Sequence, residues 1–212
     1  KYTLTQHTKA VNALAISNQG SMLLSGGRPV IPCCIVIWNL ASGEMMQEIS
    51  VLSAGFISCL AWVKLSDENE DAFVFGVSDG NIHLYEQCMD MPLFSFSSIT
   101  LANAGAVESL AWDLVHRHLA SVGDGEVQVW KVGPDGSKSK CTFSCDKVNN
   151  HARIAHVIYQ QYRETSIHSL FHTFCNNGSS MLVSYLESGF VYVLGLPPPV
   201  HMLTHIQFLL YH

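Results

Sequence analysis

The chain has 212 residues, of which 48% are hydrophobic and only 13% are charged. This composition excludes a disordered chain and predicts one compact body with a buried core. The formal net charge of -6 excludes a basic field that would attract nucleic acid or an anionic membrane, so we expect no partner of either kind.

Four units with the same order of apolar runs follow one another along the chain. The first has VNALAI from Val11, then MLLSGG, then IVIW ending at Trp38. The second has ISCLAW from Ile57, AFVFGV and NIHLY; the third has VESLAW, HLASVG and EVQVW; the fourth has IHSLFH from Ile167, MLVSYL and FVYVL. The third run of each unit alternates with period two, which is typical of a half-buried strand. Each unit is therefore predicted to contain at least three strands.

The spacing of the units indicates the kind of repeat. Their first residues, Val11, Ile57, Val107 and Ile167, are 46, 50 and 60 residues apart. A period in this range, with short strands between turn residues, predicts β-propeller blades rather than helical or leucine-rich repeats. The segment 141–165 lengthens the last step, and we expect it to hold the outer strand of the third unit and a long loop.

Two Asp-Gly pairs lie between the second and third runs of their units. They are Asp79-Gly80 in the second unit and Asp124-Gly125 in the third. A two-residue hairpin needs positive backbone φ angles, which Gly adopts freely and Asp tolerates. We therefore predict a two-residue hairpin at each pair.

These units resemble WD40 repeats, a family of β-propellers. A blade of that family carries a His before its first strand, a Ser or Thr in the second strand, an Asp in the following turn and a Trp at the end of the third strand. The resemblance covers residues 1 to about 194 and implies a structural role for the residues at these positions. They are His7, Ser25 and Trp38 in the first unit, Asp79 and Tyr85 in the second, and Ser121, Asp124 and Trp130 in the third.

The units also depart from the family pattern. Ser53 and Asn103 stand at the His positions of the second and third units, RPVIPCC replaces the Asp turn of the first unit, and ESG replaces Asp-Gly in the fourth. The His-Ser-Asp-Trp hydrogen-bond network of the family is therefore complete in no unit. We expect apolar packing to supply most of the blade stability.

The resemblance implies an all-β fold of WD40-type blades with four antiparallel strands each. About four blades are present, and the family usually closes its ring with about seven, so we expect an incomplete propeller. The predicted propeller region is 1–194, with units at approximately 5–50, 51–100, 101–150 and 165–194. A divergent tail of residues 195–212 follows, in which three consecutive prolines would interrupt a strand.

No motif for catalysis or cofactor binding is found. The chain has no phosphate-binding glycine loop and no nucleophile elbow, so we expect no catalytic residue and no cofactor. His168, His172 and Cys175 have side chains that bind zinc, but the two histidines would lie about 13 Å apart along an extended strand. No metal site is therefore predicted.

The cysteines bear on the compartment. The seven cysteines form no C-x-x-C pair, which is typical of reduced thiols, so we expect an intracellular protein, cytoplasmic or nuclear. The opening KYTLTQHTKAV has no apolar signal region, and no apolar run reaches the roughly 18 residues of a membrane span. We therefore expect a soluble protein.

The resemblance implies a non-enzymatic scaffold that binds other proteins or peptides through loop residues at one face of the propeller. The alternative is an enzyme or small-ligand binder that uses the central channel. The expected interaction face comprises the residue directly after the first residue of each of the first three units and the residue before each Asp turn: Asn12, Ser58, Glu108, Ser78 and Gly123.

Overall fold

A computed structural model gives the fold of much of the chain. It describes residues 3–27, 33–51, 55–65, 72–88, 90–113, 117–123, 126–132, 140–145, 154–158, 180–185 and 191–195. Within these residues all regular structure is β, as expected.

The strands form four separate antiparallel sheets, in each of which neighbours in sequence are neighbours in space. The first sheet contains β1 (Val11–Ile16), β2 (Met22–Gly27), β3 (Cys33–Asn39) and β4 (Met45–Val51). The second contains β5 (Ile57–Val63), β6 (Ala72–Val77), β7 (Asn81–Gln87) and β8 (Phe94–Leu101). The third contains β9 (Ser109–Asp113), β10 (His118–Gly123), β11 (Glu126–Lys131) and β12 (Lys140–Cys145), and the fourth contains β13 (Ile154–Ile158), β14 (Ser180–Tyr185) and β15 (Val191–Gly195).

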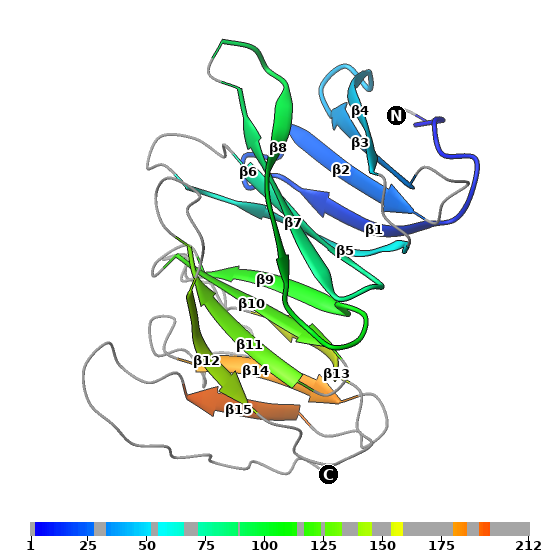
Figure 1. The fold of residues 1–212 in the computed structure, drawn as a ribbon. Coiled ribbons are helices and arrows are strands. Elements are labelled where there is room, and N and C mark those ends of the chain that lie inside the picture. The colour runs from blue at the N-terminus through cyan, green and yellow to red at the C-terminus, as the bar shows by residue number, and fades with distance from the viewer. Residues whose placement is uncertain are drawn as a thin grey trace, which may run out of the picture.

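The sheets are packed in series, as Figure 1 shows from the first sheet in blue to the fourth in orange. β1 and β2 lie against β5, β5 lies against β9, and β9 and β10 lie against β13. Successive sheets therefore meet along their first strands, which is the arrangement of blades in a propeller. The predicted fold class, sheets of four antiparallel strands in propeller order, is confirmed.

The fourth sheet begins earlier in the chain than the sequence pattern indicates. Its first strand is β13, which precedes the expected start at residue 165, and it pairs directly with β14. The sequence of β13, IAHVI, is rich in β-branched residues and so has the composition of a strand. The run from Ile167 lies outside the described residues. The outer strand expected for the third unit within 141–165 is β12, at Lys140–Cys145.

The turn between β6 and β7 also differs from the predicted two-residue hairpin. The amide of Gly80 donates a hydrogen bond to the carbonyl of Val77 (3.1 Å), so Ser78 and Asp79 are the central residues. Gly80 has a φ of 88°, whereas Asp79 is not among the positive-φ residues. This is a type I turn followed by a left-handed glycine, which also suits the twist of a hairpin. Asp124-Gly125 lies outside the described residues.

The strand register is interrupted at the same place in three blades. A β-bulge in the pairing of third and fourth strands falls immediately before Trp38, Tyr85 and Trp130. A bulge changes the direction in which the following side chains point. The repeat position of the large aromatic residue is thus identified by a backbone bulge as well as by the residue type.

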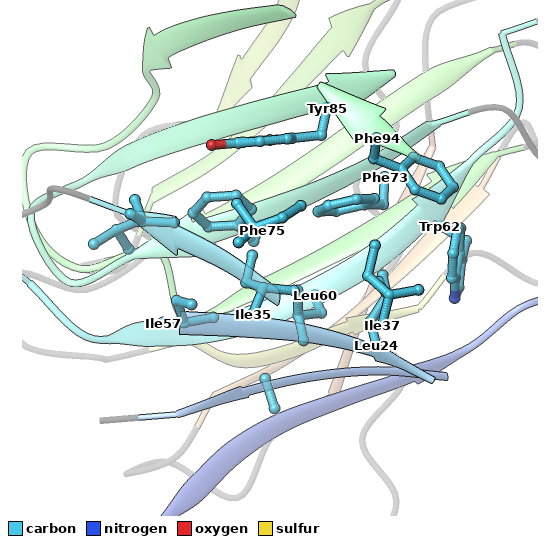
Figure 2. Close-up of a cluster of buried hydrophobic side chains, with 14 residues drawn as sticks. Leu24, Ile35, Ile37, Ile57, Leu60, Trp62, Phe73, Phe75, Tyr85 and Phe94 are labelled. Atoms are coloured by element: carbon cyan, nitrogen blue, oxygen red, sulfur yellow. The ribbon is translucent and has the colours of Figure 1, made fainter. Parts of the chain in front are cut away.

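The hydrophobic core lies between the sheets in two clusters. The first cluster joins the first and second sheets; Figure 2 shows Leu24, Ile35 and Ile37 facing Phe73 and Phe75. Aromatic contacts among neighbouring strands of the second sheet extend this cluster, including Phe73 and Tyr85 stacked at 5.4 Å. The second cluster joins the other face of the second sheet to the third, and its members are Val63, Leu65, Ala72, Val74, Ile82, Leu84, Ala102, Val107, Leu110, Trp112, Leu119, Trp130 and Val132.

Candidate interaction face

The five residues expected at the interaction face lie at one end of the blades. In an antiparallel hairpin the first strand begins where the second strand ends. Asn12, Ser58 and Glu108 stand at or just before the beginnings of β1, β5 and β9, while Ser78 and Gly123 stand at the ends of β6 and β10. We call this end of the molecule the strand-start face.

Main-chain hydrogen bonds tie the loops of the strand-start face together within the second blade. The amide of Ser78 donates to the carbonyl of Phe56 (3.0 Å). In return, the amide of Phe56 donates to the hydroxyl oxygen of Ser78 (3.1 Å). Asp79 caps the turn by accepting a hydrogen bond from the amide of Asn81 (3.0 Å). The segment before β5 and the β6–β7 turn therefore form one unit.

The segment that leads into the third blade is tied to the same unit. The carbonyl of Gly80 accepts hydrogen bonds from the amides of Ala102 (3.0 Å) and Asn103 (3.2 Å), and the amide of Val107 donates to the carbonyl of Val77 (3.2 Å). A Cβ at Gly80 would collide with the carbonyl of Asn103. Three loops from two blades thus share one fixed main-chain framework, and only glycine fits at its centre.

Two of the expected face residues connect blades to each other. The side-chain amide of Asn12 donates a hydrogen bond to the carbonyl of Ile57 (3.4 Å). The hydroxyl of Ser58 lies within hydrogen-bonding distance of the carbonyls of Gly76 and Val107. In each case the residue after the first position of one blade reaches the first residue of the next blade. A hydrogen bond to the next blade was not predicted from the sequence for these residues, although a polar residue at the same place in each unit was a signal of it.

The other expected face residues contribute differently. Glu108 is half-buried, and its amide donates to the carbonyl of Val122 (2.7 Å). Gly123 is buried, and its carbonyl accepts a hydrogen bond from the side chain of Asn103 (3.4 Å). The side chain of Ser78 is half-buried, whereas that of Asp79 is exposed. Asp79 and Glu108 are therefore two acidic residues at the strand-start face.

The first blade brings together the three residues expected to form its polar network. The hydroxyl of Ser25 lies 2.7 Å from Nε2 of His7 and accepts a hydrogen bond from the indole nitrogen of Trp38 (2.8 Å). Nδ1 of His7 lies 3.6 Å from the sulfur of Cys34. The network thus links the segment before β1 to β2 and β3.

The third blade has part of the same network. The indole of Trp130 donates to the hydroxyl of Ser121 (3.0 Å), as in the first blade. Asn103, which replaces the histidine, is buried, and its side-chain oxygen has no hydrogen-bond partner. The position of Asp124 lies outside the described residues.

The second blade replaces the polar network with aromatic packing. Phe75 and Tyr85 occupy the places of the serine and the tryptophan, and their rings lie 5.8 Å apart. His83 is stacked on Phe75 at 4.7 Å, and its buried Nε2 has no hydrogen-bond partner. The sequence pattern gave no sign that His83 would be buried.

Burial shifts the pKa values of His7, His83, Tyr85 and Cys59. It lowers the pKa of His7, an effect that the charge of Glu48 partly offsets, and it lowers the pKa of His83, which Asp79 partly offsets. It also raises the pKa of Tyr85 and raises the pKa of the Cys59 thiol to about 12. A thiol with so high a pKa is a poor nucleophile near neutral pH.

The described residues contain no cluster of metal ligands and no membrane-spanning helix. Within them, no three His, Cys, Asp or Glu side chains gather as a metal site would require. They include no helix long and apolar enough to cross a membrane. The potential ligands His168, His172 and Cys175 lie outside the described residues.

Comparison with known proteins identifies the repeats. Residues 1–39 and 95–131 match the family model described as "WD domain, G-beta repeat". The plant protein FIZZY-RELATED 3 from Arabidopsis thaliana is 35% identical over 83 residues, which make up 39% of this chain and 16% of that protein.

Solved structures agree with the order of the sheets. "Crystal structure of RRP9 WD40 repeats" superposes with a TM-score of 0.67 and 16% identity, covering 90% of this chain and 49% of that chain. "Structure of U3-55K" gives 0.67 and 17% identity, covering 92% and 51%. The chain thus spans about half the length of these structures and shares their fold. Two segments of the chain thus match the WD40 repeat model, and the order of its sheets is that of the WD40 structures.

Proposed function

We propose that the chain is a non-enzymatic scaffold that binds a protein segment on its strand-start face. The observation that carries this proposal is the shared hydrogen-bond framework of the loops at 55–56, 78–80 and 102–107. A surface whose loops are already fixed loses little conformational entropy when a partner binds. WD40 repeats are a fold typical of such scaffolds.

The charge of the face supports a basic partner segment. Asp79 is exposed and Glu108 is half-exposed, and the whole chain carries a net charge of -6. Acidic groups on a rigid face favour lysine and arginine side chains and disfavour a phosphate backbone. We therefore propose a protein or peptide partner and no nucleic acid or membrane.

Two finer assignments belong to the same proposal. We propose an intracellular site of action, cytoplasmic or nuclear, because the seven cysteines form no C-x-x-C motif in the sequence. We also propose that the repeats end near residue 194 and that 195–212 is a separate tail. No observation in the described residues favours the alternative of an enzyme or ligand binder that uses the central channel.

The test is quantitative affinity capture from a cell extract with charge-neutral variants. Asp79→Asn keeps a side chain that caps turns but removes the charge, and Asp90→Asn makes the same change in the β7–β8 loop at the opposite end of the blade. We expect proteins enriched by the wild-type chain to be lost with Asp79→Asn and retained with Asp90→Asn. Equal recovery by both variants, or no enriched protein, would refute this site.

A further inference from the structure

The outer strand of the second sheet, β8, carries a row of exposed apolar side chains. Phe96, Ile99 and Leu101 lie opposite three alternate residues of β7, so they share one face of the sheet. Their side chains are 54%, 50% and 68% exposed. The row begins beside Phe94, which is buried in the cluster between the first and second sheets. We call these three exposed residues the β8 stripe.

The outer edge of β8 already makes one strand-like pairing, with a side chain of the first blade. The amide of Phe94 donates a hydrogen bond to the side-chain oxygen of Gln47 (2.8 Å), and the side-chain nitrogen of Gln47 donates to the carbonyl of Phe94 (2.8 Å). Two residues of an antiparallel ladder exchange the same two bonds. The main-chain groups of Phe94 therefore point away from β7, and those of Phe96, two residues on, point the same way.

The other end of β8 shows the same direction for the rest of the β8 stripe. The amide of Ala102 donates to the carbonyl of Gly80 (3.0 Å), so it points toward β7. Because main-chain groups alternate along a strand, those of Leu101 and Ile99 point outward. The bulge at Ser97 accounts for the change from even to odd positions. Each residue of the β8 stripe thus presents an amide and a carbonyl to the outside.

β8 also lacks the charges that natural proteins place on exposed sheet edges. Its eight residues, FSFSSITL, include no charged side chain, whereas the outer strands β4 and β12 include Glu48 and Lys140. Among the described strands, β7 is the one neighbour of β8. A long, uncharged edge with exposed apolar residues is suited to pairing with a further strand, and charged residues on an edge prevent such pairing.

We propose that β8 binds an extended segment of a partner protein, which adds a fifth strand to the second sheet. The outward main-chain groups of Ile99 and Leu101 would begin the ladder beyond the bulge, which selects an extended backbone. The β8 stripe would pack against every second side chain of the segment and so selects apolar, uncharged residues there. The segment would continue the pairing that Gln47 makes at Phe94. This site differs from the strand-start face in both place and chemistry.

The probe is a fluorescent peptide in which valine and threonine alternate over about eight residues, the length of β8, between terminal glutamates. Titration with the full chain to about 1 mM, read by fluorescence anisotropy, should show saturable binding. Directly opposed residues point their side chains to the same face, so the valine amides should face β8. N-methylation of the valine amides should abolish binding, whereas N-methylation of the threonine amides should leave it within about threefold.

Ile99→Lys, which places a charge on the edge, should weaken binding at least about tenfold. Leu14→Lys is the matched control, since Leu14 is also exposed but lies on β1 of another sheet, and its affinity should be unchanged. Circular dichroism should show that both variants keep their sheets. Asp79→Asn should also leave peptide binding unchanged, so this result and the affinity capture are independent.

Three outcomes would overturn the proposal. The first is the absence of saturable binding, and the second is equal binding by the two N-methylated peptides, which would show that no ladder forms. The third is an Ile99→Lys chain that binds as tightly as the wild type. The two methylated peptides leave the chain itself unaltered, so they decide the question even where a variant does not fold.

Discussion

At the scale of single residues, one position of the repeat is occupied by two kinds of chemistry. Ser25 and Ser121 accept a hydrogen bond from a tryptophan, whereas Phe75 at the same place packs against Tyr85. Hydrogen bonding in the first and third blades, and dispersion in the second blade, hold the second and third strands of each blade together. Because aromatic residues replace the serine and the tryptophan in the second blade, His83 contacts aromatic rings instead of polar groups.

The burial of His83 predicts a dependence of stability on pH. Because its pKa is lowered in the folded chain, the native state binds fewer protons than the unfolded state below the ordinary value of 6.5. Stability should be greatest above that value and decline as the pH falls from about 7.5 to about 5.5. Urea unfolding across this range should show a smaller decline for His83→Phe than for the wild type.

His7, whose pKa is also lowered, should leave part of the pH dependence in the His83→Phe variant. An identical decline in variant and wild type would mean that folding does not lower the pKa of His83. The sequence could not supply this prediction, since a histidine in a strand with period-two alternation reads as an exposed residue. It is buried with Phe75 stacked on its ring and Phe96 in an edge contact with it.

At the scale of elements, glycine in the second strand sets how closely two blades approach. Gly26 and Gly76 hold the same position in β2 and β6, and each faces the first residue of the next blade, Ile57 or Val107. A Cβ at Gly26 would lie 2.8 Å from Cγ2 of Ile57, and one at Gly76 would lie 2.6 Å from Cγ1 of Val107. The β-branched residue at the start of each unit thus fits into a space that the glycine leaves.

Gly26→Ala should therefore destabilise the first joint by about 1–3 kcal/mol, as overpacking does. Ile57→Ala alone should also destabilise it, by removing buried carbon atoms. The double variant should be more stable than the sum of the two losses implies, with a coupling of roughly 0.5–3 kcal/mol, because the smaller side chain makes room for the new methyl. Denaturant unfolding of the four proteins measures this, and simple additivity would show that the two residues do not compete for space.

The elements differ in how far the sequence alone determines them. The first, second and third runs of the first three units are strands in the structure, because their apolar periodicity matches the two faces of a sheet buried between neighbours. The start of the fourth sheet was not predictable in this way. IAHVI pairs with β14 through contacts distant in sequence, which its strand composition alone does not reveal. The β6–β7 turn was similarly misjudged, because a type I turn with glycine at its end has the same residues as a two-residue hairpin.

At the scale of the whole molecule, the second sheet contributes side chains to both hydrophobic clusters of the described core. Phe73 on one of its faces belongs to the cluster shared with the first sheet, and Val74 on the other face belongs to the cluster shared with the third. Sheets packed in series depend on their neighbours for burial. A destabilising substitution in the second sheet should therefore loosen the packing of both clusters.

Phe73→Ala should lower the free energy of unfolding by about 3–5 kcal/mol, since the side chain is fully buried. Hydrogen exchange should accelerate in β2 and β3 of the first sheet and in β9 and β10 of the third as well as within the second. Ile99→Ala, on the exposed outer strand β8, should change little and serves as the control. Faster exchange confined to the second sheet would show that the blades open independently.

The hydrogen bonds between blades affect how the sequence of such a chain can evolve. Asn12 and Ser58 each bind a main-chain carbonyl of the next blade, and every residue has a carbonyl whatever its side chain. A contact of this kind does not discriminate among neighbours. A blade can therefore accumulate substitutions, or be copied next to itself, while the hydrogen bond that attaches it is kept. The coexistence of a polar first blade and an aromatic second blade in one continuous stack is the outcome that such attachment allows.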